Sequence, residues 1–237
     1  VGVALVALVV TGLGDLTATS GNITLGDDAG DTTNFGSLNV QGTTVTITED
    51  STTELADVDA TTLVLVSGGA ITQTGALTVS GTSTLTAPTA SITLSDAGND
   101  FGTVTVAGTT STAVTVRDTN GLVLGGLDIT GNLDVDAGGA LTDTGTLSVD
   151  GTASIATTGN GSNITLTGLD VTGAFDVNTA ATSNATLTNT GAIQFSGSST
   201  VNGNLVATAT SGDITDAAST TLVVTGLGDL TATTGNI

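Results

Sequence analysis

The chain has 237 residues, of which 22 are acidic and one, Arg117, is basic, so its formal net charge is −21. It contains no His, Cys, Met, Trp or Tyr, which excludes thiol nucleophiles, disulfides and ordinary zinc, copper, haem or iron–sulfur sites. The charge also excludes nucleic acid as a partner, because one arginine displaces too few counterions from a phosphate backbone.

The composition nevertheless indicates a folded chain. Mean hydropathy is +0.39, whereas a disordered chain of this charge has low hydrophobicity. The apolar residues are mostly Val, Leu, Ile and Ala, with 34 Gly, 54 Thr and only four aromatic residues, all Phe. We expect a thin core of small side chains, with the four Phe residues filling its interior.

The chain opens with an apolar run over residues 1–10. This run is too short to cross a bilayer and lacks the basic region of a signal peptide, so we expect no membrane span. Because the sequence has no initiator Met, we expect it to be a slice of a longer polypeptide. The absence of Cys fits a secreted surface protein.

Short strands are predicted along the whole chain, in about 26 runs of alternating apolar and polar residues. Gly, Asn, Asp and Ser, which accept turn conformations, separate these runs. Helical periodicity is missing, so the fold class is all-β. Clear examples of the strand pattern are the segments 75–79, 102–106, 131–135, 145–149 and 173–177.

Acidic turns are the candidate cation sites. Asp27, Asp28 and Asp31 form one cluster, and Asp96 and Asp100 form a pair. Turn carboxylates can bind Ca²⁺, but neither group matches an EF-hand loop or the nonapeptide of calcium-binding β-rolls. We expect these aspartates to serve as turn residues that also keep the chain soluble, with Ca²⁺ binding as the alternative and no other cofactor.

No catalytic constellation is predicted. Paired aspartates such as Asp134 and Asp136 could serve glycoside hydrolysis as general acid and base, but they lie two residues apart on one strand, as the outward residues of a solvated strand face do. A polysaccharide groove also needs aromatic and cationic groups that this composition lacks. Arg117 is expected to pair with Asp118 or another acidic turn. We therefore expect a protein that is not an enzyme, with a carbohydrate-acting β-helix enzyme as a remote alternative.

Internal repeats organise the chain. Residues 9–23 recur at 223–237 with fourteen of fifteen positions identical, an offset of 214. Within this period, residues 68–81 recur at 138–151, an offset of 70. We therefore expect one continuous segment over 1–237, with a super-repeat of about 214 residues made of three units of about 70.

Two all-β architectures fit such repeats: a chain of small sandwich domains or a parallel β-solenoid. Sandwich domains need bulkier core residues and distinct hairpins. Short uniform strands favour a solenoid with about three strands and roughly 22–24 residues per coil. In a solenoid, ladders of Thr and Asn can form hydrogen bonds from coil to coil.

The repeats resemble those of filamentous-haemagglutinin-like proteins, which are very large bacterial surface and secreted proteins. The residues that carry the resemblance are the segments 68–87, 92–108 and 121–145. The resemblance implies a right-handed parallel β-helix, export across the outer membrane, and an adhesive or fibre-forming role.

The predicted function is therefore structural: a rod, stalk or surface filament, extracellular and either bacterial surface-bound or secreted. The expected partners are neighbouring copies of the same repeat, joined covalently or end to end, together with lateral fibre contacts. A self-assembling subunit that stacks into a filament or sheath is the alternative.

Overall fold

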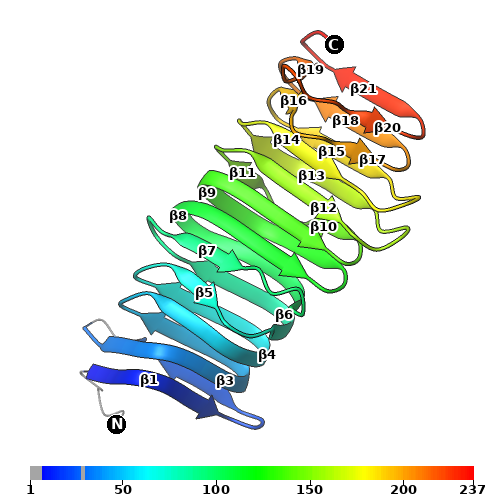
Figure 1. Ribbon diagram of the computed structural model, residues 1–237. Coiled ribbons are helices and arrows are strands. Elements are labelled where there is room, and N and C mark those ends of the chain that lie inside the picture. The colour runs from blue at the N-terminus through cyan, green and yellow to red at the C-terminus, as the bar shows by residue number, and fades with distance from the viewer. Residues whose placement is uncertain (1–6, 28–29) are drawn as a thin grey trace.

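The computed structural model describes residues 7–27 and 30–237, apart from the side chains of Thr109 and Thr110. Its chain winds into a rod of stacked coils that rises from the N-terminal to the C-terminal end (Figure 1). The described residues contain strands and no helix, and each strand pairs in parallel with strands of the neighbouring coils. The prediction of a parallel β-solenoid is confirmed, and the sandwich alternative is wrong.

Up to residue 137, several strands are long and continue around a corner of the coil. The long strands are β1 (Ala7–Thr17), β3 (Thr32–Glu49), β4 (Thr53–Ser67), β6 (Leu77–Thr86), β8 (Asp100–Asp118) and β9 (Leu122–Ala137). Between them lie β2 (Asn22–Leu25), β5 (Ile71–Gln73) and β7 (Ser91–Leu94).

In the second half the strands are short, and most coils contain the predicted three. The first of these strands are β10 (Leu141–Asp143), β11 (Leu147–Val149), β12 (Ala153–Thr157), β13 (Ile164–Val171), β14 (Phe175–Asn178) and β15 (Ala185–Asn189). The remaining strands are β16 (Ile193–Phe195), β17 (Thr200–Val201), β18 (Leu205–Ala209), β19 (Ile214–Asp216), β20 (Val223–Val224) and β21 (Gly228–Ala232).

Inward residues stack on one another along the axis. One ladder of paired residues passes through every coil, and its nine inner members are buried. The ladder has eleven members: Leu25, Ile47, Leu65, Leu85, Val106, Leu127, Leu147, Leu169, Asn189, Ala209 and Ala232. The rod therefore has about 11 turns, which at about 4.8 Å per coil makes it roughly 50 Å long.

The coils are shorter than the sequence suggests. Successive members of the ladder are 18 to 23 residues apart, and most steps fall below the predicted 22–24. The shortest step, from Ile47 to Leu65, joins two long strands that round a corner with few turn residues. Continuous strands thus save residues that separate turns would need.

The four Phe residues lie in the interior, as predicted. Phe35, Phe101, Phe175 and Phe195 are all buried. Phe175 and Phe195 are paired on neighbouring coils, which allows one ring to cover the next.

We expect the inner ladder to provide most of the stability. Leu147→Ala removes a buried side chain between two other leucines, and should lower the free energy of unfolding by about 2–5 kcal/mol. Leu227→Ala is the matched control, because Leu227 is 70% exposed, and it should cost less than about 0.5 kcal/mol. Urea unfolding followed by circular dichroism measures both, and equal losses would contradict the ladder as the main source of stability.

Candidate functional site

The outer face of the rod carries acidic residues that are spaced along the axis. Asp128 and Asp170 are both paired with Ser148, which lies on the coil between them. Asp134 and Asp176 are separated in the same way by Ser154. Two further sets have this arrangement: Asp15, Asn39 and Asp57, and Asp59, Thr78 and Asp100.

Across the described pairings, no acidic residue has another acidic residue as its direct partner. Acids two coils apart are about 9.6 Å from one another, which is close to the Debye length of about 8 Å at physiological salt. The spacing therefore lets a chain of charge −21 stack its strands with limited repulsion.

The sequence predicted that Arg117 pairs with Asp118 or another acidic turn, but its partners are two carboxylates of a neighbouring strand. Its guanidinium donates two hydrogen bonds to the carboxylate of Asp134, at 3.2 and 3.0 Å, and its Nε lies 3.7 Å from Asp136. Both carboxylates belong to β9, on the next coil, where Arg117 is directly paired with Asp136. Register between coils, and not sequence proximity, selects the partner.

Asp118 instead turns into the rod, where its carboxylate accepts backbone N–H groups. Its Oδ1 accepts from Phe101 at 2.7 Å and its Oδ2 from Asn120 at 3.0 Å. Glu49 has the same place one repeat earlier, with Oε1 accepting from the N–H of Phe35 at 2.7 Å. Burial raises the pKa of both carboxyl groups, although these backbone hydrogen bonds oppose the shift.

Buried asparagines satisfy strand N–H groups in the same way. Asn189 Oδ1 accepts from Val171 at 2.9 Å, and Asn99 Oδ1 accepts from Leu77 at 2.9 Å. Sequence reasoning missed these inward polar groups. The signal was present, because Ala185 and Leu187 alternate with polar residues and place Asn189 on the buried side.

A second set of asparagines forms the predicted ladder on the surface. The N–H of Asn184 donates to Asn163 Oδ1 at 2.8 Å, and that of Asn204 to Asn184 Oδ1 at 2.7 Å. The N–H of Leu227 then donates to Asn204 Oδ1 at 2.8 Å. This series ties the last four coils together at one corner.

The candidate cation sites are not brought together. Asp27 is exposed, Asp31 is half-buried, and Asp28 lies outside the described residues. Asp96 accepts the N–H of Gly98 and Asp100 accepts from Asn120, each at 2.8 Å. No three acidic residues among the described ones are grouped so as to hold a metal ion, and Ca²⁺ binding stays a prediction.

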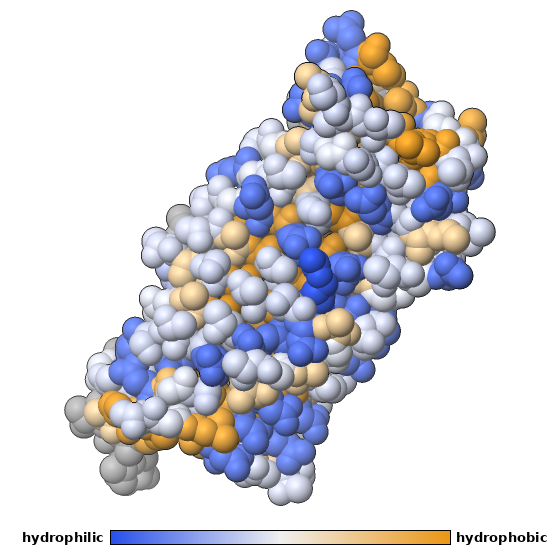
Figure 2. Space-filling view, viewed as in Figure 1, coloured by the Kyte–Doolittle hydropathy of each residue, from blue (hydrophilic) through white to orange (hydrophobic). Residues whose placement is uncertain are grey.

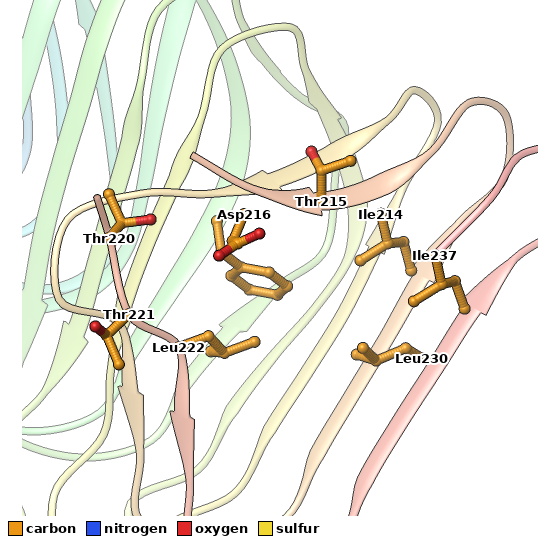
Figure 3. A pocket seen from close by; sticks show the side chains of 9 residues that line it. Ile214, Thr215, Asp216, Thr220, Thr221, Leu222, Leu230 and Ile237 are labelled. Carbon is orange, nitrogen blue, oxygen red and sulfur yellow. The ribbon is translucent and has the colours of Figure 1, made fainter. Parts of the chain in front are cut away.

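The end of the rod that carries β20 and β21 has an apolar patch, which appears in orange beside polar residues at the upper end of Figure 2. A hollow of about 410 Å³ opens there into the interior of the last coil. The side chains of Ile214, Leu222, Leu230 and Ile237 point into it (Figure 3). Phe195 also lines the hollow.

These features define a parallel β-solenoid built from sequence repeats. The chain belongs to the family described as repeats of unknown function (DUF5649), which matches residues 42–108, 111–178 and 182–237. Successive matches begin 69 and 71 residues apart. No curated protein and no solved structure matches the chain. None of the described residues lies in a helix long and apolar enough to span a bilayer.

The spacing of the acidic residues predicts that a negative charge added between two aspartates destabilises the fold. Ser148→Asp places a carboxylate directly beside Asp128 and Asp170, and should lower the free energy of unfolding by about 1 kcal/mol. The loss should shrink in about 0.5 M NaCl, where the charges are screened. Ser148→Asn is the control of equal size, and equal unfolding midpoints for the two variants would argue against the spacing having any effect.

The buried carboxylates predict a pH dependence of stability. Folding raises the pKa of Glu49. At a pH between its unfolded-state and folded-state pKa values, the native state therefore holds a proton that the unfolded chain has lost. Its contribution to stability is therefore largest below the unfolded-state pKa and falls as pH rises through the folded-state pKa.

Glu49→Gln should remove that fall and leave the variant at least as stable as the parent at neutral pH. The glutamine oxygen can still accept the N–H of Phe35, and Oε2 of Glu49 has no hydrogen-bond partner to lose among the described residues. Asp118→Asn should instead destabilise at neutral pH, because both of its carboxylate oxygens accept backbone N–H groups. Urea unfolding between about pH 4 and pH 8 tests both variants.

Proposed function

We propose that this chain is a structural segment of a long extracellular β-solenoid, acting as a rod, stalk or surface filament within a giant bacterial adhesin-type protein. The observation that supports this most is the uninterrupted stack of coils, whose first and last coils have nearly the same sequence, residues 9–23 and 223–237. Such a block can be repeated without any change of fold. The resemblance to filamentous-haemagglutinin-like repeats supports the surface location.

The hydrogen bonding between coils supports a mechanical role. Each coil donates and accepts backbone hydrogen bonds with the coils above and below, as the Ala185 to Asn204 and Leu205 to Leu227 bonds at 2.9 Å illustrate. A pull along the rod loads all bonds between two coils together, each contributing about 0.5–1.5 kcal/mol. A thin core is sufficient because this bonding is continuous.

We propose a structural and not a catalytic role. The one aspartate pair considered for glycoside hydrolysis, Asp134 and Asp136, is engaged by Arg117.

A self-assembling subunit is the second candidate. It is favoured by the apolar surface of the last coil, where Ile237 is 71% exposed and Leu222 and Leu230 line the open hollow. End-to-end stacking of separate chains would cover these side chains.

Denatured mass and location test the proposal. Antibodies raised against the 237-residue chain should label intact cells or the medium, and should detect a band of hundreds of kilodaltons on a denaturing gel. A surface-located band near 22.6 kDa would favour the self-assembling subunit. A band that protease treatment of intact cells leaves untouched would contradict a surface role.

A further inference from the structure

The structure shows one coil sequence in two different settings. Residues 9–23 and 223–237 differ only at Ser20 and Thr234. The first copy is covered on its C-terminal side by β3, and the second copy lies on β17 and β18 with its C-terminal side open. Each copy therefore displays the neighbour that the other one lacks.

The matching glycines show what the open side is shaped to receive. At Gly14, an added Cβ would lie 2.4 Å from Cδ1 of Phe35, so this ring packs directly against the glycine. At Gly228, the equivalent position in the second copy, nothing lies within 4 Å of such a Cβ. Gly14 is buried and Gly228 is exposed. The space above Gly228 is thus the counterpart of the space that Phe35 fills.

The walls of the hollow agree with this assignment. Leu230 and Ile237 line it, and they correspond to Leu16 and Ile23 of the first copy. Leu16 is paired with Val40 and Ile23 with Val45, both on β3. The hollow therefore presents the same leucine and isoleucine that β3 covers at the other end of the rod.

The N-terminal side of the first coil is complementary. Gly226 is closely approached by Asn204, whose Oδ1 would lie 2.4 Å from an added Cβ. Among the described residues, nothing lies within 4 Å of a Cβ added at its counterpart Gly12. Leu227 donates its N–H to Asn204, and the matching residue of the first coil is Leu13. The first coil thus has the shape that accepts Asn204 from a preceding block.

We propose that these two end faces are the halves of one joint. The open face of coil 223–237 receives the segment Thr32–Glu49 of a second copy of this block, with Phe35 of that copy seated over Gly228. The shared coil is present once at each joint, which keeps the ladders continuous at a period of 214 residues. This inference rests on the proposed rod function and specifies how its blocks are joined.

A two-block chain tests the joint. It consists of the full 237-residue chain followed directly by a second copy of residues 24–237. In the first coil, Ala18 donates its N–H to the carbonyl of Gln41 on β3 at 2.8 Å. The equivalent Ala232 N–H should gain that bond in the two-block chain, so its hydrogen–deuterium exchange should slow by about tenfold or more relative to the single block. Unchanged exchange at Ala232 would overturn the proposal.

Gly228→Val provides a matched variant. In the single block the added side chain meets open space, so the unfolding midpoint should be unchanged. In the two-block chain the valine side chain occupies the space that Phe35 of the second copy would fill. The two coils should then no longer pair, so the Ala232 N–H should return to fast exchange. If the Ala232 N–H of the two-block chain exchanged equally fast with and without the valine, the packing of Phe35 over Gly228 would be ruled out. A surface protein of high mass whose joint stays unprotected would leave the rod function standing while this inference fails.

Discussion

The structure depends on one constraint, which is that parallel backbone hydrogen bonds join every coil to the next. Directly paired residues in parallel strands point to the same side, so an inward residue on one coil fixes the orientation of its partner on all others. The coils differ by several residues in length, yet the inner ladder from Leu25 to Ala232 is preserved. Turns and local register shifts, such as that between Leu166 and Leu169, absorb the difference.

The composition follows from this constraint. Stacked coils bring backbones close together at corners, where glycine avoids a clash: an added Cβ at Gly145 would lie 2.0 Å from the carbonyl oxygen of Gly125. The interior is narrow, and two of the four rings have a small residue beside them on one side. Phe35 lies against Gly14, and Phe175 is paired with Ala153 on the preceding coil. Thr and Val tolerate the extended backbone of the faces.

Much of the fold could be predicted because alternation and turn residues are local signals. They identified the all-β class, the parallel solenoid and the buried Phe residues. The predicted short runs, about 26, form 21 strands among the described residues, because several runs join into one long strand. The partner of Arg117 could not be predicted, since it depends on how many residues each coil contains, and turn lengths are not encoded by alternation. Buried Glu49 and Asp118 were missed for another reason. The alternation of apolar and polar residues places both on the buried side of their strands, but acidic side chains are ordinarily expected to face solvent.

The proposed joint places apolar surface on the rod axis and leaves most of the charge on the flanks. The flanks carry most of the acidic side chains, so two rods lying side by side would repel one another unless counterions intervened. In the proposed joint, the end face contributes Leu222, Leu230 and Ile237 together with unpaired strand edges. Contact there covers apolar surface and completes backbone hydrogen bonds. Because the acids alternate with neutral residues from coil to coil, a longer rod adds no closer charge contacts than a short one.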